Sequence, residues 1–202
     1  GNYNDDSGSA AIIITQAGAT IVVNGYTGIY DGAPHAATGS ATGALGEPLS
    51  GLNLGAVFTD VPGGIANWTF TDVTGNYTNA SGSVAIVITK AVATIVVNGY
   101  TGVYDGSPHG ATGSATGALG EPLSGLNLGA SFTNVPGGTA NWTFTDITGN
   151  YNEDSASVAI VINRADAVIV VTPYNVAYDG AAHTATGSAT GLPMRAAAGT
   201  RW

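Results

Sequence analysis

Residues 52–72 read LNLGAVFTDVPGGIANWTFTD, which is two alternating segments on either side of a turn. Leu52 and Phe58 share one parity in the first segment, and Trp68 and Phe70 share one parity in the second, with threonine between them. Period-two alternation with one apolar face is typical of half-buried β-strands. The PGG between the segments suits a tight turn, because Pro presets φ and Gly permits a positive φ. The stretch therefore predicts two antiparallel neighbouring strands.

Nearly identical words return along the chain at a fixed interval. YDGAPHAATG at 30–39 recurs as YDGSPHGATG at 104–113 and as YDGAAHTATG at 178–187, 74 residues apart each time. A period of this size indicates an array of small domains. The predicted organisation is the last strand of a preceding repeat (1–17), two complete repeats (18–91 and 92–165), the first part of a third repeat (166–191) and a divergent tail (192–202).

The rest of the repeat also has the composition of a β protein. Glycine occurs 31 times, and short β-branched runs are separated by turn words such as NG, DG and TGN. The strands predicted in the first complete repeat cover residues 20–23, 34–42, 52–59, 66–72 and 83–89. The predicted fold is all-β, with tandem small β-sandwich (immunoglobulin-like) domains in an extended array. A β-grasp-related, mostly-β repeat also suits this number of strands.

A comparison of the two complete repeats indicates which side of each strand is buried. They differ at 14 of 74 positions, and the differences include Val57, which becomes Ser131, and Ile65, which becomes Thr139. Both changes to a polar residue fall on the parity expected to face water. The opposite parity is identical in the two repeats and gives the predicted core: Leu52, Leu54, Phe58, Trp68, Phe70, Leu126, Leu128, Phe132, Trp142 and Phe144.

The charge balance excludes several classes of partner. Charged residues make up only 8% of the chain, and four Lys and Arg against 13 Asp and Glu give a net charge of −9. Nucleic acid is therefore not an expected partner. Without cysteine there is neither a disulfide nor a thiolate metal site. The apolar runs are too short to span a bilayer, so no membrane insertion is predicted.

The repeated polar residues are interpreted as structural. Each histidine lacks a second His or Cys in its own repeat, and Asp-Gly favours a tight turn. The histidines concerned are His35, His109 and His183, and the turn residues are Asp31, Asp105 and Asp179. Tyr77 and Tyr151 either hydrogen-bond back across a loop as corner tyrosines or pack as surface rings. No nucleophile with an oriented base and no phosphate-binding glycine pattern is present, so the chain is not expected to be an enzyme.

Three further patterns are weaker. The candidate calcium ligands are Asp5, Asp6, Glu153 and Asp154. The equivalent stretch at 75–82 has neither carboxylate, which favours solvated polar turns over a calcium site common to all repeats. The acceptor pattern for N-glycosylation occurs at Asn67, Asn76, Asn79 and Asn141. An isopeptide bond at Lys90 cannot be general, because its counterparts are Gln16 and Arg164.

The words YDG…H…ATG and WTFTD…GNY occur together in each complete repeat. In this combination residues 1–191 resemble MBG-type, or bacterial immunoglobulin-like, tandem repeats of large bacterial surface and secreted proteins. The resemblance implies a mostly-β domain used in series as an adhesin stalk or extracellular fibre. The repeats would then act as spacers, and no catalytic residue is carried over.

The expected function is therefore a structural repeat region of a bacterial extracellular filament or adhesin stalk, located outside the cell or at its surface. The partners would be neighbouring repeats or other copies of the chain, with residues 1–17 of one copy completing 166–191 of the next. If instead the sequence is a window of a longer array, such strand exchange need not occur. The alternative from another class is a glycan- or calcium-binding cell-surface module.

Overall fold

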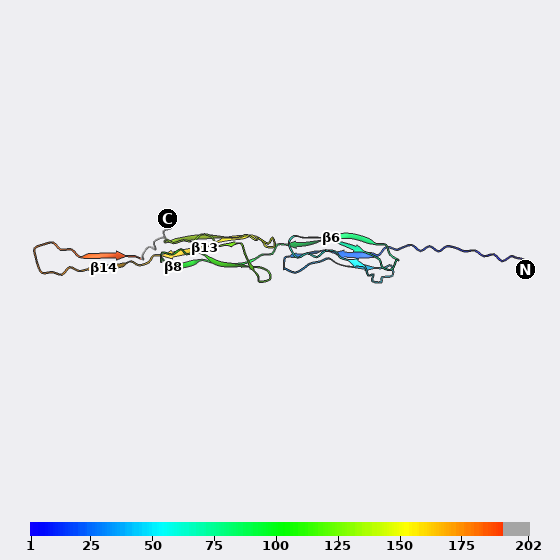
Figure 1. The fold of residues 1–202 in the computed structure, drawn as a ribbon, viewed down its shortest axis with the longest axis horizontal. Helices are drawn as coiled ribbons and strands as arrows, with labels where there is room; N and C mark the ends of the chain where they lie inside the picture. Colours follow the sequence, from blue (N-terminus) through cyan, green and yellow to red (C-terminus); the bar gives the residue numbers. More distant parts are fainter. Residues whose placement is uncertain (192–202) are drawn as a thin grey trace, which may run out of the picture. The chain divides into compact units, whose positions relative to one another are not determined.

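The computed structural model describes residues 1–191, and these residues form β-strands and loops without a helix. The predicted all-β class is thus confirmed (Figure 1). The chain divides into a first unit, Gly1–Ala91, and a second unit that begins at Val92. The divergent tail predicted at 192–202 lies outside the described residues. Residues 1–191 contain no helix that is long and apolar enough to cross a membrane.

The first unit contains two sheets. Its strands are β1 (Thr20–Asn24), β2 (Tyr26–Ile29), β3 (Thr38–Thr42), β4 (Leu52–Asn53), β5 (Gly63–Phe70) and β6 (Ala80–Thr89). One sheet consists of β1 paired antiparallel with β3, and the other has the order β2-β6-β5-β4. Within the second sheet β2 runs parallel to β6, whereas β6 with β5 and β5 with β4 are antiparallel.

The second unit repeats this plan and adds a hairpin. Its strands are β7 (Thr94–Asn98), β8 (Tyr100–Val103), β9 (Thr112–Thr116), β10 (Pro122–Leu123), β11 (Leu126–Asn127), β12 (Gly137–Phe144), β13 (Asp154–Asn163), β14 (Val168–Thr172) and β15 (Thr186–Thr190). Its sheets have the orders β10-β9-β7 and β11-β12-β13-β8, and within residues 92–191 β14 pairs only with β15. In this unit β8 runs parallel to β13.

The core of the first unit lies between its two sheets. Ile86 and Ile88 of β6 and Ala66 of β5 are buried and pack against Val23 of β1. A second cluster joins buried Phe70 of β5 to Ala41 of β3, with Ile21 of β1 packed on it. Because both sheets contribute to the same clusters, the architecture is of the sandwich type.

Strand β6 shows how the sequence produces this packing. Its VAIVIT segment alternates, so that Ile86 and Ile88 are each 1% exposed while Val87 between them is 38% exposed. Burying one such side chain stabilises the fold by about 1.5–3 kcal/mol. The outward parity proposed for Val57 and Ile65 is also confirmed, because both side chains are exposed.

The strand predicted at 52–59 is wrong beyond its first two residues. Only Leu52–Asn53 pair with β5, with Leu52 opposite Phe70. The Asn53 Oδ1 then accepts the Gly55 N–H at 2.9 Å, and Gly55 turns the chain at φ +85°. A side chain at that position would overlap the Asn67 carbonyl oxygen. Phe58 therefore leaves the sheet and forms an isolated antiparallel bridge with His35.

Two other features differ from the sequence prediction. Of the strand expected over 34–42, only β3 forms a regular strand, and β2 was not predicted at all.

The PGG turn is present: the Gly63 N–H donates to the Asp60 carbonyl at 2.8 Å, Gly63 has φ +82°, and the Val61–Pro62 bond is cis. It leads directly into β5, which runs antiparallel to the short β4.

Candidate functional site

The repeated YDG…H word builds a compact cluster of three side chains. In the first unit the His35 ring stacks on Tyr26 of β2, with ring centroids 3.9 Å apart and planes inclined by 10°. The His35 Nε2 lies 2.9 Å from Asp31 Oδ1, which also accepts the Ala33 N–H at 2.8 Å. The Asp-Gly turn and the strand β2 are thus held together through one imidazole.

Two backbone hydrogen bonds also hold the main chain of His35 in place. The His35 N–H donates to the Phe58 carbonyl at 2.8 Å, and the Phe58 N–H donates to the His35 carbonyl at 2.9 Å. The Ala33 N–H and then the His35 side chain lower the pKa of Asp31, so its carboxylate is held in the charged form that accepts both bonds. The cluster therefore joins β2, the Asp-Gly turn and the segment carrying Phe58.

The cluster occurs again in both later copies of the word. His109 stacks on Tyr100 with centroids 4.0 Å apart, and its Nε2 lies 2.9 Å from Asp105 Oδ1. In the third, partial repeat the His183–Tyr174 centroid distance is 4.3 Å. His183 Nε2 there lies 2.6 Å from the Asp179 carboxylate. The structural interpretation of these histidines and aspartates agrees with this geometry. The tyrosine partner was missed, although a Tyr nine residues before each His was a visible signal.

The second cluster is built around a corner tyrosine, as one of the two sequence interpretations predicted. The buried Tyr77 hydroxyl accepts the Ala44 N–H at 3.0 Å and donates to the Glu47 carboxylate. The hydrogen bond from Tyr77 lowers the pKa of Glu47, and the same bond raises the pKa of Tyr77. Gly43 leaves the space for this contact, because a Cβ there would overlap Glu47 Oε1.

The second unit forms the same corner with slightly different distances. The Tyr151 hydroxyl accepts the Ala118 N–H at 2.9 Å and donates to Glu121 Oε1 at 2.5 Å. The Tyr151 N–H donates to the Asp146 carboxylate at 2.8 Å, which closes the loop between β12 and β13 on itself. The corner thus connects two parts of each complete repeat that lie about 30 residues apart in sequence.

The remaining predicted site residues are dispersed. Of the predicted core, Phe70, Trp142 and Phe144 are buried. The others are half-buried: Leu52, Leu54, Phe58, Trp68, Leu126, Leu128 and Phe132.

The four candidate glycosylation positions are all exposed: Asn67, Asn76, Asn79 and Asn141. Asn79 is partly engaged, since its Oδ1 accepts the Asp72 N–H at 2.8 Å.

The calcium candidates are exposed carboxylates. Asp5 and Asp6 lie in the extended N-terminal stretch, and Glu153 and Asp154 stand at the start of β13. Within the described part of the chain, no three His, Cys, Asp or Glu side chains cluster as metal ligands would.

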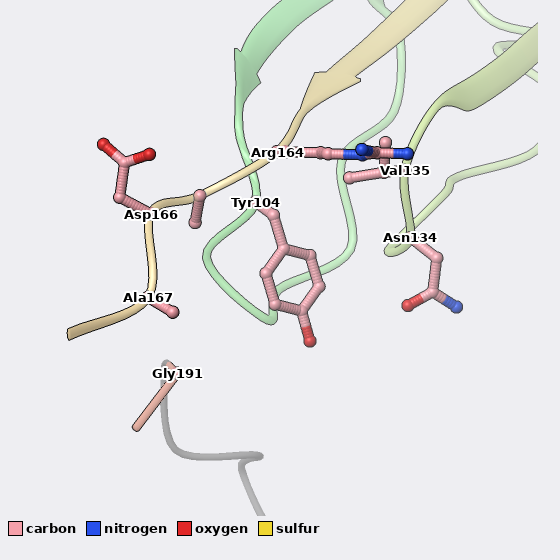
Figure 2. A pocket seen from close by; sticks show the side chains of 8 residues that line it. Tyr104, Asn134, Val135, Arg164, Asp166, Ala167 and Gly191 are labelled. Atoms are coloured by element: carbon pink, nitrogen blue, oxygen red, sulfur yellow. The ribbon is translucent and has the colours of Figure 1, made fainter. Parts of the chain in front are cut away.

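A surface pocket lies in the second unit around Arg164, with Tyr104, Asn134, Val135 and Asp166 among its lining residues (Figure 2). Its polar groups do not converge. Figure 2 shows the Arg164 side chain extended beside Val135, while the Tyr104 hydroxyl and the Asp166 carboxylate point away from it. Such an arrangement offers no set of groups aimed at one ligand.

Two strand-like segments carry apolar side chains that are mostly exposed. Residues 12–14, in the AAIIIT segment, are strongly exposed, and among residues 1–191 no strand pairs with them. Strand β14 is exposed along its whole length, and β15 is the one described strand that pairs with it. Neither surface resembles a catalytic cleft, and both are of the kind that strands cover in a complete sandwich. No protein-family model, curated protein or solved structure matches this chain.

Proposed function

We propose that this chain is a structural repeat region of a bacterial extracellular filament or adhesin stalk, in which the repeats serve as spacers. The observation that carries the proposal is how the repeated polar side chains are used. His35, Asp31 and Tyr26 bind one another, and Tyr77 binds Glu47, all within one unit. Taken singly, these residue types would suggest acid–base chemistry, but here their contacts hold loops and strands together.

The same contacts support the proposal of a non-enzymatic role. The His35 imidazole is 13% exposed at its side chain, and its Nε2 faces the Asp31 carboxylate. General acid–base catalysis needs a group that can reach a substrate proton. In this cluster the groups with suitable chemistry are directed at each other instead. The repetition of the cluster three times also suits a building unit better than a single active site.

The composition argues against nucleic acid as a partner. The net charge is −9, with only four Lys and Arg in the chain. The resemblance to bacterial surface repeats agrees with an extracellular position. The partners proposed are neighbouring repeats or other copies of the chain, because exposed β-strand segments bind best to strands that complete their sheet.

Calorimetric titration tests this role against the alternative of a glycan- or calcium-binding module. Calcium chloride and a panel of soluble glycans would be added to the 202-residue chain. A spacer is expected to give only heats of dilution. A saturable heat with one site for each complete repeat would contradict the proposal and favour the binding module.

A further inference from the structure

Each complete repeat pairs a strand near its beginning with the strand at its end. In the first unit β2 runs parallel to β6, with Tyr26 opposite Ile86 and Ile29 opposite Thr89. In the second unit β8 runs parallel to β13 in the same register. The chain enters the first repeat through β1 and β2, which only Gly25 separates, and leaves it after β6. The strands that tension along the chain would reach first are therefore bonded to each other.

The direction of this pairing decides how tension would load the hydrogen bonds. Because β2 and β6 are parallel, the beginning of β2 and the end of β6 lie at opposite ends of their shared ladder. A chain pulled from both sides of the repeat draws β2 toward its beginning and β6 toward its end, so the two strands must slide past each other. Sliding loads the evenly spaced bonds of a parallel ladder together, whereas peeling from one end loads them in turn.

Further hydrogen bonds lengthen the pairing beyond the end of β2. The Tyr30 N–H donates to the Thr89 carbonyl at 2.8 Å, and the Thr89 hydroxyl donates to the Gly28 carbonyl at 3.1 Å. In the second unit the Tyr104 N–H donates to the Asn163 carbonyl at 2.8 Å. Both complete repeats thus continue the ladder by one residue.

Glycine at the start of each ladder allows the two backbones to approach closely. A Cβ at Gly25 would overlap the Ala85 carbonyl oxygen of β6. Gly99 has the same place in the second unit, where a Cβ would overlap the Ala159 carbonyl oxygen of β13. A side chain at either glycine would push the early strand off its partner, at the end of the ladder where tension enters.

The histidine cluster holds the same short strand by a second contact. The Tyr26 ring lies over Gly28, since a Cβ at Gly28 would overlap the Tyr26 hydroxyl. The His35 ring stacks on Tyr26 with centroids 3.9 Å apart. His35 is itself held by Asp31 through its side chain and by Phe58 through its main chain. Strand β2 is therefore attached both to β6 and to the loop that carries His35.

We propose that β2 with β6, and β8 with β13, are mechanical clamps that set the force at which each complete repeat unfolds when the chain is pulled along its length. The ladder and the Tyr26–His35 stack must both fail before the first repeat extends. The repeated YDG…H word then serves to hold the early strand in its clamp. The clamp rests on the proposed structural role, since a spacer in a filament or stalk carries tension.

Changing the direction of pulling tests the clamp within one folded protein. The chain contains no cysteine, so handles can be attached at chosen cysteines of the 202-residue chain. Gly18→Cys with Lys90→Cys makes β2 and β6 slide past each other. Ala33→Cys with Lys90→Cys pulls the two strands apart from their adjacent ends. The three positions are exposed, and a Cβ at Gly18 meets no atom, so both variants should fold as the unaltered chain does.

The sliding direction should require a peak force at least about twofold higher than the peeling direction, because the bonds of the ladder then resist together. The length released identifies the event. It should be at most about 250 Å for the 90 − 18 = 72 residues between the first handles and about 200 Å for the 90 − 33 = 57 residues between the second. Equal forces in the two directions, or a higher force for peeling, would overturn the clamp.

A pair of glycine variants separates the clamp from general stability when the chain is pulled by its ends. Gly25→Ala places a Cβ against the Ala85 carbonyl oxygen in the clamp. The control Gly55→Ala places one against the Asn67 carbonyl oxygen outside the clamp and also strains a φ of +85°, so it should lower the melting temperature at least as much. Gly25→Ala should nevertheless lower the force of one unfolding event more than the control does. A force that follows the melting temperature in both variants would contradict the clamp.

The outcomes of these experiments are distinct from those of the titration. If Gly25→Ala prevents the first unit from folding, the two pulling directions still decide, because their handles lie outside the ladder. A chain that gives only heats of dilution but unfolds at equal force in both directions would keep its spacer role and lose the clamp. A saturable heat would count against the spacer role whatever the forces are.

Discussion

Replacing Ile86 by alanine removes a side chain that the structure places at the centre of the first unit. Ile86 is 1% exposed and packs in the cluster that includes Ile88, Ala66 and Val23. Truncating a fully buried isoleucine to alanine costs about 2–5 kcal/mol, from lost transfer energy and the cavity left behind. A repeat of 74 residues has a total stability of about 4–11 kcal/mol. The substitution should therefore remove a large fraction of the stability of the unit.

Two other substitutions calibrate this effect. Val87→Ala deletes methyl groups from the adjacent outward position and should cost less than about 1 kcal/mol. Ile12→Ala changes the counterpart of Ile86 in the exposed N-terminal segment, so in the monomer its effect on the free energy of unfolding should be near zero.

Hydrogen–deuterium exchange with mass spectrometry measures the effect in each unit separately, because β6 begins ASGS and β13 begins DSAS. Ile86→Ala should speed exchange throughout β5 and β6 and leave β12 and β13 unchanged. Equal effects of Ile86→Ala and Val87→Ala would refute the inward assignment and with it the sandwich core.

Further predictions concern the polar clusters. The Tyr77 hydrogen bond is the first cause of the lowered pKa of Glu47 in the folded chain. The Glu47 carboxylate therefore contributes its full stabilisation above its ordinary pKa of 4.5, and this stabilisation is lost as pH falls through the lower pKa of the folded state. Tyr77→Phe should thus reduce the melting temperature at pH 7 more than at pH 3, as thermal unfolding would show; an equal reduction would contradict the linkage. Gly43→Ala should lower the melting temperature too, because its Cβ overlaps Glu47 Oε1, whereas Gly46→Ala meets no atom and is strained only by its positive φ. Asp31→Asn keeps an oxygen acceptor for the Ala33 N–H and should preserve slow exchange of that amide, whereas Asp31→Ala should lose it; identical exchange in both variants would rule out the turn contact.

The strands with regular alternation were predictable because their environment is simple. Residues 20–23 and 83–89 were expected as strands and lie in β1 and β6. Both segments are rich in β-branched side chains, so local preference and burial point to the same structure. The corner tyrosine could be proposed for the same reason, since TGNY immediately precedes a clear strand.

The errors occur where glycine or a parallel pairing decides the structure. Strand β2 is only four residues long, contains Gly28, and exists because it pairs in parallel with β6. The strand expected over 52–59 ends early because Gly55 adopts a positive φ, which the alternation of leucines does not reveal. The Tyr26–His35 stack depends on β2, so the nine-residue spacing of Tyr and His was visible in the sequence but did not show that the two rings touch.

Stretching single chains tests the central claim, that the sequence contains independent β units suited to a load-bearing array. The chain would be held by its ends and pulled at constant velocity. The account predicts two cooperative unfolding events, one for each complete repeat of 74 residues, and each event should release at most about 250 Å of chain. Ile86→Ala should lower the force of one event only. Smooth extension without discrete events, or a single event that releases both repeats together, would contradict the account.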